Sequence, residues 1–118
     1  MTRRFAHHRL DVYELALELA VSAKGISAGI PRGYRGLSDQ LLRSATGVVL
    51  LIAEGANRFT PGQKRQRFVE ARGECGEAAA TVELCARLEL VSQEESLSFQ
   101  RMADQVCAML TGLIHRHG

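Results

Sequence analysis

The sequence contains no tryptophan, only two prolines and 5% aromatic residues. Scarce proline and abundant Ala, Leu, Glu and Arg are typical of helical proteins, so we expect an all-α fold. No apolar stretch approaches the roughly 20 residues that a membrane-spanning helix needs. We therefore expect a cytoplasmic protein with no membrane partner.

Cysteine is also scarce. Cys75, Cys85 and Cys107 are an odd number without CxxC spacing, a pattern that indicates neither a disulfide framework nor a zinc site. We interpret all three as small core residues. Hydrophobic residues, in contrast, make up 46% of the chain. Its 118 residues can form one core, so a single domain over residues 1–118 is expected.

The spacing of polar and apolar residues predicts four helices. Thr60 before Pro61 is typical of an N-cap residue followed by proline at the first helical position. Ser92 with Glu95 three residues later predicts a capping box. Short connections favour antiparallel neighbours, hence an up-down-up-down antiparallel four-helix bundle. The predicted helices are 10–24, 38–56 (N-capped by Ser38), 61–88 and 93–115.

The middle of the second predicted helix is apolar on all sides over residues 48–53. A helix without a polar face must be covered all round, whereas a lone four-helix bundle leaves one side of each helix in water. A partner subunit is the natural cover. Small residues on the third helix allow a close approach of another helix. The candidate oligomer interface is Val48, Leu51, Gly73, Gly76 and Ala80.

Glu54 is the one acid in this apolar region, and a buried carboxylate needs a partner. Arg58 lies four residues later, in the favourable order for an ion pair on one helix. Arg72 and Glu77 are candidate cross-helix partners for Glu54 and Arg43. A catalytic carboxylate would need a second acid, a histidine or a metal at the same pocket, and the sequence nominates none. We predict no enzyme, no catalytic residue and no cofactor.

The histidines lie in two pairs near the ends of the chain: His7 with His8, and His115 with His117. An even number of antiparallel helices would bring these ends together. Neither pair has the i, i+4 spacing that places two imidazoles on one helix face, and chain ends rarely preorganise ligands. We predict no metal site.

Residues 58–67 carry four positive charges and no acid, with the start of the third helix at their centre. Backbone donors, helix dipole and cations would together favour a phosphate there. The alternative is a solvated helix start, which a sequence pI of about 8.6 favours for a monomer. The candidate nucleic-acid-binding residues are Arg58, Lys64, Arg65 and Arg67, with Arg32 and Arg35 from the loop before the second predicted helix.

Several motifs are distributed along most of the chain: Leu10-Asp11-Val12-Tyr13 with Ala16, Ile30-Pro31 before the second helix, Gln40-Leu41 with Arg43, Ile52-Ala53-Glu54-Gly55, and Ala71 with Gly73 and Glu77. With these motifs the chain resembles the small four-helix-bundle proteins encoded in intervening sequences of bacterial large-subunit rRNA genes. The resemblance implies a structural role for Gln40, Arg43, Ile52, Ala53, Glu54, Gly55, Gly73 and Glu77. It also implies assembly as rings of five, while more distant relatives bind nucleic acid as basic accessory subunits.

The chain departs from this family at four positions. Gly47, Val49 and Leu51 stand where relatives usually carry serine, proline and asparagine, and Glu74 stands where serine is common. The middle of the polar line on the second helix is therefore apolar here. A function that depends on the missing polar residues is in doubt, while the packing role of the helix is strengthened.

Two functional hypotheses remain. The first is a non-enzymatic, self-assembling bundle that serves as a binding scaffold, with weak and largely electrostatic affinity for RNA or DNA. The second is a structural or protein-interaction module with an unknown protein partner and no nucleic-acid binding. Basic residues concentrate in residues 1–67 and acidic ones in 68–118, which also permits head-to-tail association of copies.

Overall fold

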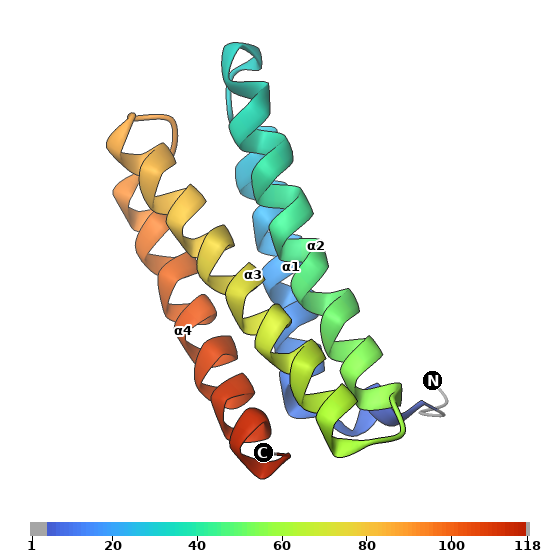
Figure 1. Cartoon of the computed structure of the whole chain (residues 1–118). Coiled ribbons are helices and arrows are strands. Elements are labelled where there is room, and N and C mark those ends of the chain that lie inside the picture. Colours follow the sequence, from blue (N-terminus) through green and yellow to red (C-terminus); the bar gives the residue numbers. More distant parts are fainter. Residues whose placement is uncertain (1–4, 118) are drawn as a thin grey trace.

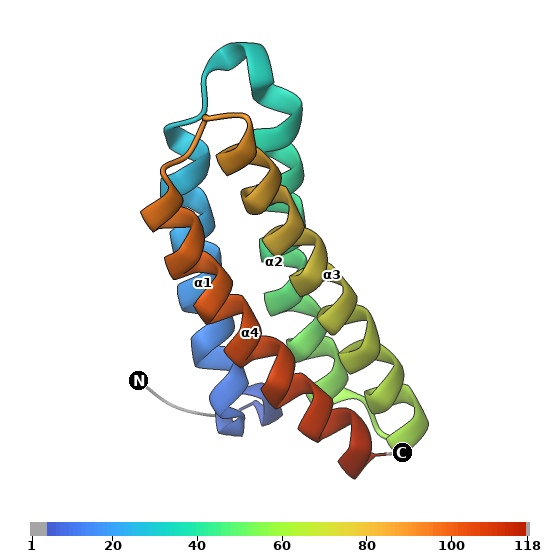
Figure 2. The same cartoon turned by 90° about the vertical axis from the view of Figure 1, so that its left-hand side faces the viewer.

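A computed structural model describes residues 5–117, whose long helices run alternately up and down (Figure 1). Each helix packs on its neighbour in the chain, and the last returns to the first (Figure 2). The bundle measures 43 × 30 × 22 Å. The predicted all-α, antiparallel four-helix bundle is confirmed. Its helices are α1 (Asp11–Ala28), α2 (Arg35–Asn57), α3 (Pro61–Arg87) and α4 (Gln93–Arg116), with 3-10 turns η1 (Ala6–Arg9) and η2 (Arg32–Tyr34).

Buried side chains recur along the helices at alternating intervals of three and four residues. This spacing keeps one apolar stripe facing the bundle axis and favours the small crossing angles of four-helix bundles. The stripes are Val12, Ala16, Leu19, Ala23 and Ile26 on α1, Phe68, Ala71, Cys75, Ala78, Val82 and Cys85 on α3, and Phe99, Ala103, Val106, Leu110 and Leu113 on α4.

Within residues 5–117, no helix combines the length and apolar character that crossing a membrane requires.

Side-chain caps set the starts of α3 and α4. The Thr60 hydroxyl accepts from the Gln63 amide at 3.2 Å, and the Gln63 side chain accepts from the Thr60 amide. At α4 the Ser92 hydroxyl accepts from the Glu95 amide at 3.0 Å but donates to the Glu95 carboxylate. Both predicted N-caps are confirmed, although the second forms only the serine half of a capping box.

The first two helices differ from their predicted bounds. Helix α1 continues through Gly25 to Ala28, because burial of Ile26 and Ser27 outweighs the low helix propensity of glycine. Helix α2 begins at Arg35, so Ser38 lies inside it and is no N-cap. The Ser38 hydroxyl instead contacts the Ser27 hydroxyl, which ties the end of α1 to the start of α2.

The apolar segment of α2 is covered largely by the bundle itself. Val48, Val49 and Ile52 are buried in the core, and Leu51 packs against it. Only Leu50, 64% exposed, points clearly into solvent. The prediction that Val48 faces a partner subunit is therefore wrong, because its side chain is fully enclosed by the helices of its own chain.

At Gly55, side chains of α3 lie directly against the backbone of α2. A Cβ atom at this position would lie 2.7 Å and 2.9 Å from ring carbons of Phe68, and 3.1 Å from the Cβ of Arg67. Phe68 is only 1% exposed and has little room to move. The glycine thus lets a core aromatic ring lie directly against the helix backbone.

We expect Gly55→Ala to lower the free energy of unfolding by about 1–2 kcal/mol, because overpacking costs about 1–3 kcal/mol while alanine adds up to about 1 kcal/mol of helix propensity. Urea unfolding followed by circular dichroism measures the change. Gly47→Ala is the matched control in the same helix: its Cβ would meet nothing closer than 3.5 Å, so that variant should be more stable than the parent chain. Equal effects of the two changes would contradict the packing role of Gly55.

Candidate functional site

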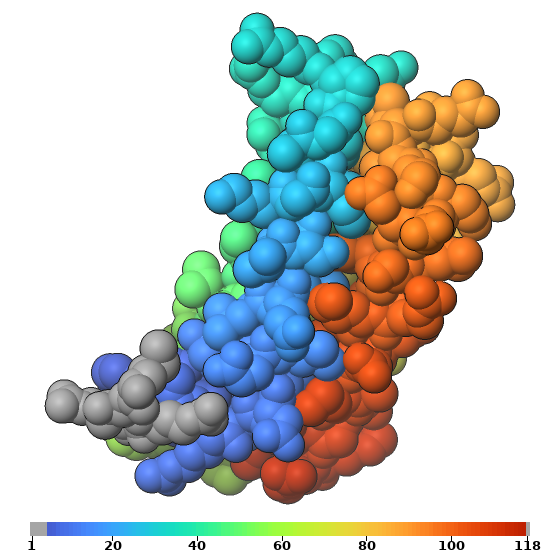
Figure 3. All heavy atoms as spheres, turned by 180° about the vertical axis from the view of Figure 1, so that it is seen from behind, coloured from blue at the N-terminus to red at the C-terminus, as the bar shows by residue number. Residues whose placement is uncertain are grey.

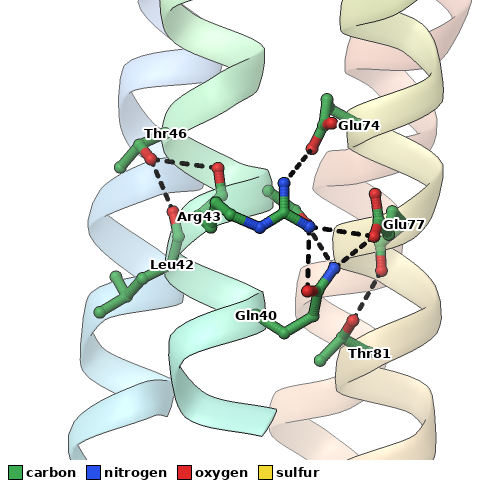
Figure 4. A network of polar contacts seen from close by, with 8 residues as sticks. Gln40, Leu42, Arg43, Thr46, Glu74, Glu77 and Thr81 are labelled. Carbon is green, nitrogen blue, oxygen red and sulfur yellow. Dashed lines mark hydrogen bonds and ion pairs between the residues drawn. The ribbon is translucent and has the colours of Figure 1, made fainter. Parts of the chain in front are cut away.

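A polar network joins α2 to α3 midway along the bundle (Figure 4). Arg43 Nη2 lies 3.3 Å from Glu77 Oε1 and donates to Gln40 Oε1 at 2.9 Å. The Gln40 amide donates to the Glu77 carboxylate and, at 3.2 Å, to the hydroxyl of buried Ser44. The predicted pairing of Arg43 with Glu77 is confirmed.

Two of the departures from the family pattern face each other beside this network. A Cβ on Gly47 would lie 3.5 Å from Glu74 Oε2 and 3.6 Å from the Cδ and Cγ atoms of Glu74. These are ordinary van der Waals distances, so a small residue on α2 and the larger glutamate on α3 face each other without a clash. Glu74 Oε2 is buried without a hydrogen-bond partner among residues 5–117, and its nearest cation, Arg43 Nη1, is 3.9 Å away.

Glu54 closes the polar line of α2 where the helix ends. Its carboxylate lies 3.2 Å from Arg67 Nε and 3.7 Å from Arg58 Nη2, and half of its side chain is exposed. The ion pair with Arg58 is thus confirmed, whereas the expected burial of Glu54 is wrong. Arg72 is not its partner either, because that guanidinium points to α4 and donates to Thr111 Oγ1 at 2.8 Å.

The cations after Glu54 stabilise the turn between α2 and α3. Arg67 Nη1 donates to Glu70 Oε1 at 2.6 Å, and this hydrogen bond lowers the pKa of the Glu70 carboxyl. Lys64 Nζ donates to the Ala56 carbonyl at 2.8 Å and so satisfies an acceptor at the C-terminus of α2. Arg65 is exposed and forms no ion pair within residues 5–117.

One end of the molecule is strongly basic. We define the basic end as residues 5–12, 53–67 and 110–117, which the antiparallel topology brings together (Figures 1 and 3). Two of its cations, Arg9 and Arg116, were not predicted from the sequence, although the meeting of the chain ends could have indicated them. The basic residues of this end are Arg9, Arg58, Lys64, Arg65, Arg67 and Arg116, and its acids are Asp11 and Glu54.

A pocket of about 230 Å³ opens at the basic end. The cations on its wall are Arg9, Lys64 and Arg116, joined by His117. Ala6, Leu10, Ala56, Phe68 and Leu113 complete the lining, which includes no acid from the described part of the chain. Cations from three separate segments therefore converge on one concave surface, an arrangement suited to a phosphate group.

Arg32 and Arg35 lie at the opposite end of the bundle, in η2 and at the first residue of α2. They share that end with the α3–α4 connection, which carries Glu89 (Figure 1). The structure therefore separates these two arginines from the cations of residues 58–67. One nucleic-acid strand would contact both groups only by running the length of the bundle.

All four histidines belong to the basic end. The His7 ring packs between those of Phe5 and Tyr13 and contacts the Asn57 amide, and burial together with neighbouring His8 lowers the pKa of His7. His117 packs on the Phe68 ring. Among residues 5–117, no three His, Cys, Asp or Glu side chains gather into a group that could hold a metal ion.

Helix α3 carries an uncharged stripe on its solvent side, which we call the α3 stripe: Val69, Gly73, Gly76, Ala80 and Leu84. All five residues are exposed. No heavy atom lies within 4 Å of a Cβ built on Gly73 or Gly76, so the surface there is open. Three of the candidate interface residues thus lie on this outer face, while Leu51 packs against the core on α2.

Comparison with known proteins gives a family and a fold. The model of the family described as 23S rRNA-intervening sequence protein matches residues 8–112. One similar solved structure is described as a protein of unknown function from the S23 ribosomal protein family of Bacteroides thetaiotaomicron. It superposes with a TM-score of 0.83 at 23% identity, over 87% of this chain and 97% of that one. At this identity the likeness establishes the fold alone. No curated protein matches the chain.

Replacement of Arg43 should destabilise the bundle, because it removes the ion pair with Glu77. We expect Arg43→Ala to lower the free energy of unfolding by no more than about 1 kcal/mol, because both Arg43 and Glu77 are partly exposed. Most of that loss should vanish at about 1 M salt, where the screening length falls to about 3 Å. Urea unfolding at low and high salt measures it, with Arg35→Ala on the same helix as the control. A loss independent of salt would point to side-chain packing instead.

Proposed function

The chain belongs to the 23S rRNA-intervening sequence protein family, and from that premise we propose a non-enzymatic, self-assembling bundle that acts as a binding scaffold for nucleic acid. The observation that carries the proposal is the basic end, where Arg9, Lys64 and Arg116 surround a pocket without acids. Such a surface attracts a phosphate backbone of any sequence and releases its counterions. The affinity of one copy is weak and falls with salt.

The cations of the basic end have different roles in this proposal. Arg58 and Arg67 are engaged by Glu54 and set the shape of the turn. Within the described residues, Arg9, Arg65 and Arg116 form no ion pair, so their charges remain available to a phosphate. Phosphate contacts of this kind position a nucleic acid without reading its bases.

Self-association supplies the rest of the affinity in this scheme. The α3 stripe supports it, because an uncharged helix face with small residues at its centre lets a second helix approach closely. A second copy of the chain is the proposed occupant, in a ring of five as the family resemblance implies. Several basic ends on one assembly would bind one strand with an avidity that no single copy has.

The alternative is a protein-interaction module without nucleic-acid affinity. The ion pairs of Arg58 and Arg67 favour it, because they reduce the charge that the turn offers to a phosphate. In that case the α3 stripe is the surface that binds the protein partner, and the basic end only helps to keep the bundle in solution. The two functions differ in their response to charge removal.

We expect the triple variant Arg9→Gln, Arg65→Gln and Arg116→Gln to lose tenfold or more of its affinity for a short mixed-sequence RNA or DNA at low salt. Fluorescence anisotropy measures the binding, and the slope of log affinity against log salt should fall by about 2–3, roughly one phosphate contact per arginine.

The control is a second triple variant at the far end, Arg32→Gln, Arg35→Gln and Arg87→Gln, which removes the same charge from exposed helix termini. It should bind as the parent chain does. Equal losses in both variants would mean that net charge alone attracts the nucleic acid. No binding by the parent chain would favour the protein-interaction module.

We expect Gly73→Leu to abolish self-association while helix content stays unchanged, because a leucine would project from the centre of the α3 stripe. Light scattering gives the native mass and circular dichroism the helicity. Gly112→Leu is the matched control, since Gly112 is an equally open glycine on α4. If Gly73→Leu assembles like the parent chain, the stripe is not the contact between copies.

A further inference from the structure

Two of the three cysteines meet across the interface of α3 and α4. Cys75 is fully buried on α3, and Cys107 is partly buried on α4. The Cys75 thiol donates to the Ala103 carbonyl of α4 at 3.4 Å, and Cys107 Sγ lies 4.0 Å from the Arg72 carbonyl of α3. Each thiol thus reaches the backbone of the other helix, which places the two cysteine side chains next to each other at this interface.

The surroundings of the two sulfur atoms differ. A hydrogen bond that Cys75 can donate to the Cys107 thiolate lowers the pKa of Cys107 to about 7. The Arg72 guanidinium acts in the same direction, while burial and the Asp104 carboxylate oppose it. The same hydrogen bond and burial raise the pKa of Cys75. The reactive thiolate of the pair is therefore Cys107, the one with access to solvent.

Cys85 provides an internal comparison. It is fully buried in the core on α3, and burial raises the pKa of its thiol. It has the chemistry of a structural cysteine and should be inert. The reactivities of Cys107, which is partly exposed, and of Cys85, which is buried, can therefore be compared in one sample.

We propose that Cys75 and Cys107 form an oxidisable thiol pair, a covalent modification site at which a small hydroperoxide such as hydrogen peroxide generates an intramolecular disulfide between α3 and α4. The Cys107 thiolate attacks one peroxide oxygen, and the O–O bond breaks to leave a sulfenic acid and, after protonation of the leaving hydroxide, water. Cys75 sulfur then attacks the Cys107 sulfur. The S–O bond breaks, and the sulfenic hydroxyl leaves with the Cys75 proton as a second water.

The pair fits this chemistry because the resolving thiol lies next to the reacting one at the same helix interface. A sulfenic acid on Cys107 would form directly beside Cys75, whose burial protects it from the peroxide itself. The product would join α3 and α4 at the centre of their interface. It involves neither the basic end nor the α3 stripe, so the proposed function and this modification succeed or fail independently.

The test is peroxide treatment of the reduced full-length protein followed by intact mass measurement. We expect a loss of about 2 Da, the two hydrogens of one disulfide, on a chain that remains monomeric in a non-reducing denaturing gel. After cleavage by a Glu-specific protease, the peptides that contain Cys75 and Cys107 should remain linked by the disulfide. Cleavage at Glu77 and Glu83 separates Cys75 from Cys85, so a linkage to either cysteine can be told apart. Before oxidation, iodoacetamide should modify Cys107 about tenfold faster than Cys85.

Three variants distinguish the roles. Cys85→Ala should still form the disulfide. Cys107→Ser should lose no hydrogen, and Cys75→Ala should retain a sulfenic acid on Cys107 that a dimedone probe labels. If Cys75→Ala does not fold, the parent chain and Cys107→Ser still decide the question. An unchanged mass, a linkage to Cys85 or a disulfide between chains would each overturn the proposal.

Discussion

The close packing of α2 on α3 at Gly55 is the constraint on which the rest of the molecule depends. Because the Phe68 ring occupies the place of a side chain there, the end of α2 and the first turns of α3 are held together. Glu54, the residue before this contact, is consequently directed outward to Arg67, and Lys64 reaches the last turn of α2. The close packing beside the α2–α3 turn thus depends on one missing Cβ atom.

Gly47 on α2 and Glu74 on α3 face each other in the middle of the same interface. A Cβ atom at position 47 would lie 3.5 Å from Glu74 Oε2, which is an ordinary van der Waals distance, so the glutamate does not require a glycine opposite it. Arg43 lies close enough to offset part of the charge of Glu74. The carboxylate is therefore accommodated by a neighbouring cation and not by an exchange of volume with position 47.

Local chemistry made much of the fold predictable. The capping threonine at position 60, the Glu54–Arg58 pair and the apolar spacing of the helices each depend on residues within one or two turns. The predictions that were wrong concern residues whose environment is set by contacts with distant helices. Gly25 does not end α1, because contacts with another helix outweigh its propensity, and Val48 is buried by helices whose rotation no short-range pattern determines. The meetings of Arg9 with Arg116 and of Cys75 with Cys107 depend on how distant helices face each other, which periodicity alone does not specify.

The distribution of charge along the bundle makes the molecule an electric dipole. At one end Arg9, Arg65 and Arg116 form no ion pair among residues 5–117, while at the other end Arg32, Arg35 and Arg87 are offset by Glu83, Glu89, Glu94 and Glu95. In the field of a polyanion such a body experiences a torque that turns its long axis toward the surface before contact. In the proposed assembly, copies that arrived upright would stand parallel, with their α3 helices at the same height. Alignment by the field would thus remove rotational freedom that neighbouring copies would otherwise lose when they associate.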